Sequence, residues 1–93
     1  MPEEKAVSVR VTGRVQGVGF REWTRHQATD LGLTGWVRNE PDGSVSALLV
    51  GPDAAVDTML ERLYHGPSYA RVASVTGEPA TPGERFSDFR ITR

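Results

Sequence analysis

Apolar and polar residues alternate from Ala6 onward, and this alternation predicts the first strand. The apolar members are three β-branched residues, Val7, Val9 and Val11, with polar side chains between them. A period of two is typical of a strand that buries only one of its faces. The alternation ends in residues 13–19, a segment that holds three glycines. We therefore expect a strand that leads into a glycine-rich loop.

A helical spacing begins directly after this loop. Four residues share one face of the predicted helix: Phe20, Thr24, Ala28 and Leu31. Gly32 suits the left-handed conformation that ends many helices, so we expect the helix to cover residues 20–31. A second strand is predicted at residues 34–39.

The middle of the chain has the chemistry of a tight turn, because Glu40-Pro41-Asp42-Gly43 combines a proline with a glycine that accepts a positive φ. This turn should join the second strand to a third strand at residues 44–50 as a hairpin. Gly51-Pro52-Asp53 then opens a second helix, and His65-Gly66-Pro67 closes it. The helix carries an apolar stripe with core-facing spacing, which we expect to be buried: Val56, Met59, Leu60, Leu63 and Tyr64.

The last third of the chain predicts two more strands. A fourth strand is expected near residues 71–76, where the alternation slips between Val72 and Val75 and indicates a bulge or a kink. Two prolines and two glycines predict a loop over residues 77–87. Phe89 and Ile91 alternate in a short final strand.

This order of elements, strand-helix-strand-strand-helix-strand, predicts an α+β fold. The arrangement is a ferredoxin-like sandwich, an antiparallel sheet with two helices on one face. The length of 93 residues indicates one domain, residues 1–93, with residues 1–5 frayed. Because this fold supports many activities, function must come from a site.

Composition excludes several classes of function. The chain has 11 Lys+Arg against 12 Asp+Glu, a balance that disfavours binding to nucleic acid. It has no cysteine and only two histidines, His26 and His65, so we expect no disulfide, no thiol nucleophile, no metal site and no cofactor. No apolar run approaches the ~20 residues that span a bilayer, and no signal-peptide pattern opens the chain. We expect a cytoplasmic protein without a membrane partner, and nothing demands more than a monomer.

The segment Gly13-Arg14-Val15-Gln16-Gly17-Val18-Gly19-Phe20-Arg21 has the features of an anion-binding loop. Gly17 and Gly19 allow consecutive backbone N–H groups to point inward as a cradle. The helix that follows adds unpaired N–H groups and the positive end of its dipole. The sequence matches neither the Walker A loop nor the dinucleotide-binding fingerprint.

Arg21 is the candidate that makes this loop more than a turn. A cation in the first helical turn opposes the helix dipole at a cost of ~0.3–1 kcal/mol, which a bound anion would reverse. Four arginines and one glutamate lie between residues 10 and 25, and arginine grips phosphate with two parallel donors. The competing interpretation is a tight glycine turn with Arg21 on the surface. Arg14 lies either near the cradle or at a solvated strand end.

Asn39 is the second candidate, at the end of the second strand and just before the hairpin turn. It is either a turn residue, which asparagine favours, or an amide that holds a water molecule. In a ferredoxin-like fold the loop after the first strand and the end of this strand can converge. That convergence would place Asn39 beside the cradle.

Together these segments resemble the acylphosphatase family. The resemblance lies in residues 13–21, in Gly32-Leu33-Thr34-Gly35-Trp36-Val37-Arg38-Asn39 and in Asp42-Gly43-Ser44-Val45, and it extends over residues 6–91. It implies hydrolysis of acyl phosphates, small molecules, to a carboxylate and phosphate. Arg21 would bind the phosphoryl oxygens, and Asn39 would orient the attacking water. The cradle would be completed by the backbone N–H groups of Val15, Gln16, Gly17, Val18, Gly19 and Phe20.

Two other functions compete with this hypothesis. The same cradle could hold phosphate or carbamoyl phosphate without turnover, as a regulatory binding module. A single-strand RNA binder shares the sheet topology, but its aromatic pattern on the central strands is missing here, since the first strand carries Val and Ser. The presence of both Arg21 and Asn39 favours the enzyme. The sequence does not specify the acyl group.

Overall fold

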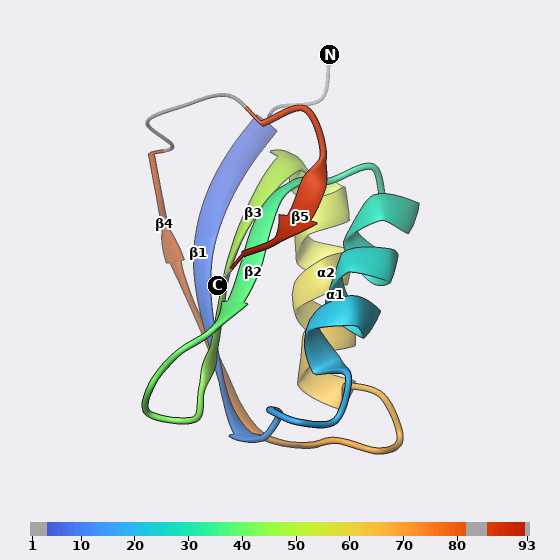
Figure 1. Cartoon of the computed structure of the whole chain (residues 1–93). Coiled ribbons are helices and arrows are strands. Elements are labelled where there is room, and N and C mark those ends of the chain that lie inside the picture. Colours follow the sequence, from blue (N-terminus) through green and yellow to red (C-terminus); the bar gives the residue numbers. More distant parts are fainter. Residues whose placement is uncertain (1–3, 82–85, 93) are drawn as a thin grey trace.

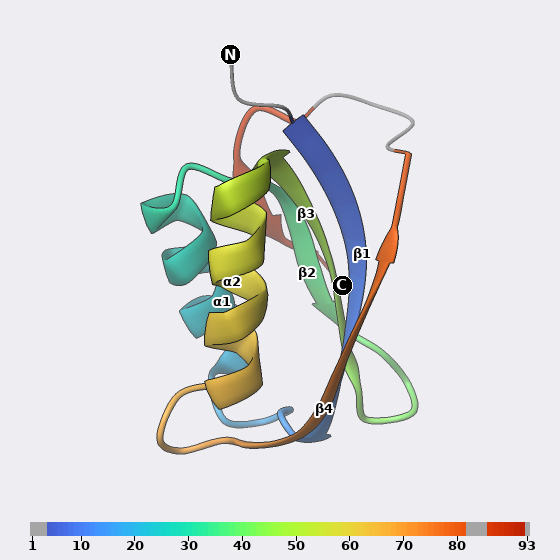
Figure 2. The same cartoon turned by 180° about the vertical axis from the view of Figure 1, so that it is seen from behind.

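The computed structural model describes residues 4–81 and 86–92 (Figure 1). The elements in chain order are β1 (Glu4–Arg14), α1 (Phe20–Asp30), β2 (Thr34–Asn39), β3 (Val45–Pro52), α2 (Asp53–His65), β4 (Arg71–Pro79) and β5 (Phe89–Ile91). The strands form one sheet in the order β4-β1-β3-β2-β5. Both helices cover the same face of it, as Figures 1 and 2 show. The predicted ferredoxin-like sandwich is confirmed.

The sheet is mixed rather than fully antiparallel, because β5 pairs in parallel with β2. The other three pairings are antiparallel. The direction of β5 follows from the connection between β4 and β5, which crosses from one edge of the sheet to the other. The chain leaves β4 at one edge of the sheet and returns at the opposite edge, antiparallel to β4 and therefore parallel to β2. The sequence alone carries no sign of that pairing.

The limits of β1 and β4 differ from two expectations. Glu4 and Lys5 are not frayed, since they pair with Pro52 and Gly51 of β3. The fourth strand runs on to Pro79 instead of ending at residue 76. Pro79 fits because an edge strand tolerates the missing N–H of proline. Residues 1–3 of the predicted frayed segment and 82–85 of the predicted loop lie outside the described residues.

The predicted bulge in β4 is confirmed. Thr12 pairs with Ser74 and Gly13 with Val72, so Ala73 is an extra residue without a partner on β1. This irregularity lies between Val72 and Val75, where the alternation of the sequence slips.

Helix α1 begins at Phe20, as predicted, and ends one residue early at Asp30. Gly32 has φ 75° and donates its N–H to Thr29 O at 3.0 Å, while Leu33 N–H donates to Ala28 O at 2.9 Å. These two bonds form the glycine cap that the sequence predicts. None of the helices in the described residues is long and apolar enough to cross a bilayer.

The core lies between the sheet and the two helices. Its most buried large side chains come from every layer and are Phe20, Leu49, Met59, Leu63, Val11, Val15, Val37, Val45 and Val56. The predicted stripe of α2 is buried at Val56, Met59 and Leu63, but Tyr64 is 64% exposed. Tyr64 occupies the last position of the stripe, beside the β4 edge where the sheet ends. Its ring therefore borders solvent, which suits a polar hydroxyl.

The β2–β3 hairpin closes through the turn that the sequence predicts. Glu40 N–H donates to Ser44 O at 2.9 Å, and Gly43 N–H donates to Glu40 O at 3.1 Å. Asp42 Oδ1 accepts from the Ser44 hydroxyl at 2.6 Å and from its N–H at 2.9 Å. These hydrogen bonds, the Ser44 hydroxyl first, and the nearby Arg10 guanidinium hold the pKa of Asp42 below its ordinary value.

This pKa shift predicts a pH-dependent contribution of Asp42 to stability. A carboxylate whose pKa is lowered by folding stabilises the native state above its unfolded pKa, about 3.9, and loses that contribution as pH falls through the folded pKa. Asp42→Ala should therefore lower the free energy of unfolding at pH 7 and converge with the wild type in strong acid. Urea denaturation of both proteins at pH 7 and in acid below the folded pKa of Asp42 measures this, and an unchanged difference would contradict it.

Candidate active site

The loop between β1 and α1 is fixed at both ends by buried side chains. Val15 and Phe20 are each 1% exposed, whereas Gly17 and Gly19 between them lie at the surface. Gly19 takes the left-handed conformation, φ 77° and ψ 17°, and its carbonyl accepts the N–H of Trp23 at 3.1 Å, which starts the helix. The sequence thus gives apolar anchors at the loop ends and glycine where the chain turns sharply.

The N-terminus of α1 has no side-chain cap among the described residues. Its first-turn N–H groups therefore lack the hydroxyl or carboxylate that usually accepts from them. A helix end of this kind is a site for an anion, because the free N–H groups and the dipole favour negative charge.

A cleft of about 220 Å³ opens at this helix end. Its lining residues come from the loop, from α1, from the end of β2 and from β5: Val15, Gly17, Gly19, Phe20, Arg21, Glu22, Asn39 and Ile91. The structure therefore brings Arg21 and Asn39 together, as the sequence predicts. Two predicted loop residues, Gln16 and Val18, do not line it with their side chains. Val18 packs against the core, and Gln16 turns toward the hairpin.

Arg21 is half-buried and forms no ion pair or side-chain hydrogen bond with any described residue. Two neighbouring arginines are neutralised, since Arg10 pairs with Asp42 and Arg25 with Glu22. Arg14 is exposed at the end of β1 and does not line the cleft. The positive charge of this segment thus reaches the cleft through Arg21.

Glu22 is the one carboxylate in the lining, and its charge is compensated. The Arg25 guanidinium donates to it, and this hydrogen bond is the main reason that the pKa of Glu22 lies below its ordinary value. His26 Nε2 lies 3.4 Å from the same carboxylate. An anion in the cleft therefore meets a paired carboxylate next to an unpaired guanidinium.

Asn39 ends β2 with its side chain on the helix-covered face, two positions after buried Val37. Its Oδ1 is buried and accepts no hydrogen bond from the described part of the chain. The turn role that the sequence leaves open belongs instead to Asp42. A buried acceptor without a partner costs about 1–3 kcal/mol, so its presence calls for a donor from outside the protein.

Two lining residues were not predicted from the sequence. Ile91 reaches the cleft because β5 pairs in parallel with β2, at Val37. Glu22 follows Arg21 in the sequence, but nothing in the sequence indicated that its side chain lines the cleft. Only the helix geometry turns both Arg21 and Glu22 toward it.

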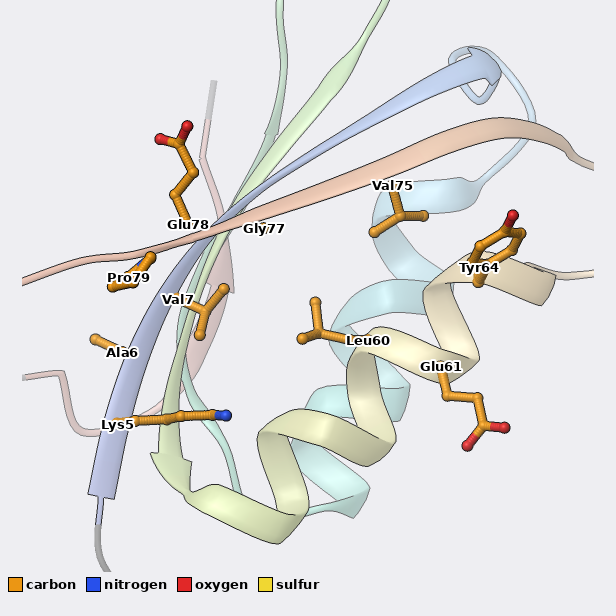
Figure 3. Close-up of a pocket in the computed structure, with 10 residues that line it drawn as sticks. All are labelled: Lys5, Ala6, Val7, Leu60, Glu61, Tyr64, Val75, Gly77, Glu78 and Pro79. Carbon is orange, nitrogen blue, oxygen red and sulfur yellow. The ribbon is translucent and has the colours of Figure 1, made fainter.

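A larger cavity, of about 490 Å³, lies between α2 and the β4 edge (Figure 3). Val7, Leu60 and Val75 gather between the strand and the helix there. Its cation, Lys5, is occupied by Asp53 and Asp57 at 2.6 Å and 2.9 Å. None of the predicted site residues lines this cavity. Volume alone would select it, but Arg21 and the buried Oδ1 of Asn39, both without partners among the described residues, belong to the smaller cleft.

Comparison with known proteins agrees with this geometry. The family model described as acylphosphatase matches residues 7–91. This chain belongs to the acylphosphatase family. It is 57% identical over 91 residues to an acylphosphatase of Rhizobium meliloti (strain 1021), which covers 98% of this chain and 96% of the relative.

Solved acylphosphatases have the same fold. The structure from Coxiella burnetii is 40% identical, with a TM-score of 0.90, over 96% of this chain and 93% of that one. The structure from Bacillus subtilis is 32% identical, also with a TM-score of 0.90, over 98% of this chain and 100% of that one. The candidate cleft described above therefore lies on a scaffold that the family shares.

The uncapped helix and the free Arg21 predict that the acylphosphatase binds inorganic phosphate. Phosphate at ~100 times its Kd should stabilise the native state by ~2.7 kcal/mol, read as a rise in the thermal midpoint. Arg21→Ala should lose most of this rise. Arg10→Ala is the matched control, because it removes the same charge from a residue outside the cleft. Equal phosphate shifts in both variants would contradict the assignment.

Proposed function

We propose that this acylphosphatase works through Arg21 and the loop amides, which grip the phosphoryl group, and through Asn39, which holds the attacking water. The observation that carries the proposal is the pairing of two unsatisfied groups in one cleft. Arg21 lacks an anionic partner and Asn39 Oδ1 lacks a donor among the described residues. The phosphoryl group of an acyl phosphate and a water supply what each group lacks.

Binding of the phosphoryl group needs several donors arranged around one anion. The backbone N–H groups of Val15–Phe20 would act as these donors, and the uncapped end of α1 adds its dipole. Arg21 adds a guanidinium with two parallel donors. These groups stabilise the charge that spreads over the equatorial oxygens in the transition state, and they need no reorganisation when it forms.

Attack on phosphorus requires a water in line with the departing carboxylate. Asn39 Oδ1 can accept a hydrogen bond from this water, which turns an oxygen lone pair toward phosphorus. The position of Asn39 at the end of β2, in the lining of the cleft, would set this orientation, and orientation of a reactant is a large part of such rate enhancements.

The chemistry needs no general acid. The water oxygen bonds to phosphorus, the bridging P–O bond breaks, and its electron pair leaves with the carboxylate. An acyl phosphate dianion and one water give one carboxylate and one dihydrogen phosphate. Because the acid of the leaving group has a pKa near ~4, the carboxylate departs without a proton.

The same observations support one compact catalytic unit. Arg21 and Asn39 line one cleft within residues 1–93, which supports a single domain. We also propose a monomer in the cytoplasm that binds no nucleic acid, and the balance of 11 Lys+Arg against 12 Asp+Glu supports the last point. A regulatory module that only binds phosphate is the alternative. It would use Arg21 and the loop, but it would leave the orphaned Oδ1 of Asn39 without a purpose.

Two substitutions test the assigned roles with benzoyl phosphate as substrate. Arg21→Ala should lower kcat by about 10²–10³, the cost of losing one preorganised donor to the transition state. Asn39→Ala should lower kcat by about 10² through loss of water orientation. The inhibition constant of phosphate should rise strongly in Arg21→Ala and little in Asn39→Ala.

Circular dichroism of each variant serves as the folding control, and p-nitrophenyl phosphate serves as the substrate control. Wild-type turnover in either folded variant would refute its role. A change in KM alone would mean that the residue binds substrate and transition state equally, contrary to the proposal. Phosphate binding without any hydrolysis would support the regulatory module instead.

A further inference from the structure

Gln16 belongs to the phosphate loop, but its side chain leaves the cleft and reaches another part of the fold. Its amide Nε2 lies 2.8 Å from Glu40 O and 2.8 Å from Ser44 O. Both bonds run from a half-buried side chain to backbone carbonyls. One amide nitrogen thus uses its two hydrogens on two separate acceptors.

These carbonyls close the hairpin that carries Asn39. Glu40 directly follows Asn39, and Ser44 O also accepts the N–H of Glu40 at 2.9 Å. The last pair of the β2–β3 ladder is Asn39 with Val45. Gln16 therefore binds the hairpin at the first position beyond Asn39.

The sheet separates the phosphate loop from Asn39. β1 carries the phosphate loop and β2 carries Asn39, and β3 lies between them. Two strand spacings are about 9.5 Å, so small changes in sheet twist would move the water site relative to the cradle. Figure 1 shows the β1–α1 loop and the β2–β3 hairpin at the same end of the sheet. Gln16 spans this gap directly.

We propose that Gln16 is a positioning residue, which fixes the phosphate cradle at the correct distance from Asn39. The inference rests on the roles proposed above for Arg21 and Asn39. Gln16 itself touches neither substrate nor water with its side chain. It acts by holding the hairpin, and it contributes to the cradle only through its backbone N–H.

The side-chain chemistry restricts which residue can do this. Two carbonyl acceptors require a group with two donors at the end of a side chain of this length. A carboxylate has only acceptors, so Gln16→Glu keeps the shape but loses both bonds. Gln16→Ala removes the two side-chain hydrogen bonds to the hairpin, here called the tether, and keeps the backbone N–H of the cradle. Both variants therefore separate the tether from phosphate binding.

The test measures kcat, KM and the inhibition constant of phosphate for Gln16→Ala and Gln16→Glu. We expect kcat to fall by ~10- to ~10²-fold, since misplacement by ~1 Å costs about that much. KM and the phosphate inhibition constant should stay near wild type, because Arg21 and the cradle amides are intact. Unchanged kcat with only a lower thermal midpoint would mean a structural role and overturn the proposal.

A double-mutant cycle shows whether Gln16 acts through Asn39. If it does, Gln16→Ala adds little to the loss already caused by Asn39→Ala, because the water is no longer held. If the two losses multiply in full, Gln16 acts independently and the proposal fails.

Asp42→Ala is the matched control for the hairpin. Asp42 binds Ser44 in the same turn, at 2.6 Å and 2.9 Å, and pairs with Arg10 of β1, but it forms no hydrogen bond or ion pair with a described residue of the loop. We expect lower stability with near-wild-type kcat. A loss of kcat as large as that of Gln16→Ala would contradict the proposed role of the tether, since any weakening of the hairpin would then be enough to lower kcat.

The single variants separate the two proposals. Wild-type turnover in both Arg21→Ala and Asn39→Ala would refute the site itself, and the tether with it. Loss of turnover in both, with unchanged kcat in the Gln16 variants, would refute the tether alone.

Discussion

The free N-terminus of α1 is the constraint on which the rest of the site depends. Its first N–H groups have no side-chain cap among the described residues, and Arg21 adds a cation where the dipole is already positive. Both features are unfavourable for the protein alone and favourable once an anion is present. The buried anchors Val15 and Phe20 hold this arrangement in place. The fold thus maintains an electrostatic imbalance that an acyl phosphate relieves.

The sheet supplies the second half of the site at a fixed distance. Asn39 comes from β2, Ile91 from β5, and neither strand is a neighbour of β1. The hairpin bonds from Gln16 to Glu40 O and Ser44 O join the loop to that side of the sheet. A binding module needs only the cradle, whereas a hydrolase also needs the water at a defined angle. In the mechanism that we propose, the connection between loop and hairpin is therefore what hydrolysis requires beyond anion binding.

The larger cavity of this molecule is not the one that contains the candidate site. The cavity beside β4 is the larger, but its cation Lys5 is already paired and its surroundings are apolar. The smaller cleft holds the buried Oδ1 of Asn39 without a donor in the described residues. Thr24 Oγ1 is also buried without a partner among the described residues, but Thr24 does not line the cleft. The site therefore depends on Asn39 and Arg21 lying together, and not on one unsatisfied atom alone.

The sequence by itself predicted most of the elements and the two candidate site residues, because these depend on local chemistry. Period-two valines set β1, Gly32 set the end of α1, and a cation at a helix start marked Arg21. Only the tertiary structure decided what depends on distant pairing. The extension of β4, the parallel direction of β5 and the exposure of Tyr64 follow from which strand lies at the edge. The hydrogen bonds of Gln16 likewise form only once β1, β2 and β3 are assembled, since they join residues more than twenty positions apart. The burial of Asn39 Oδ1 depends on the same assembly.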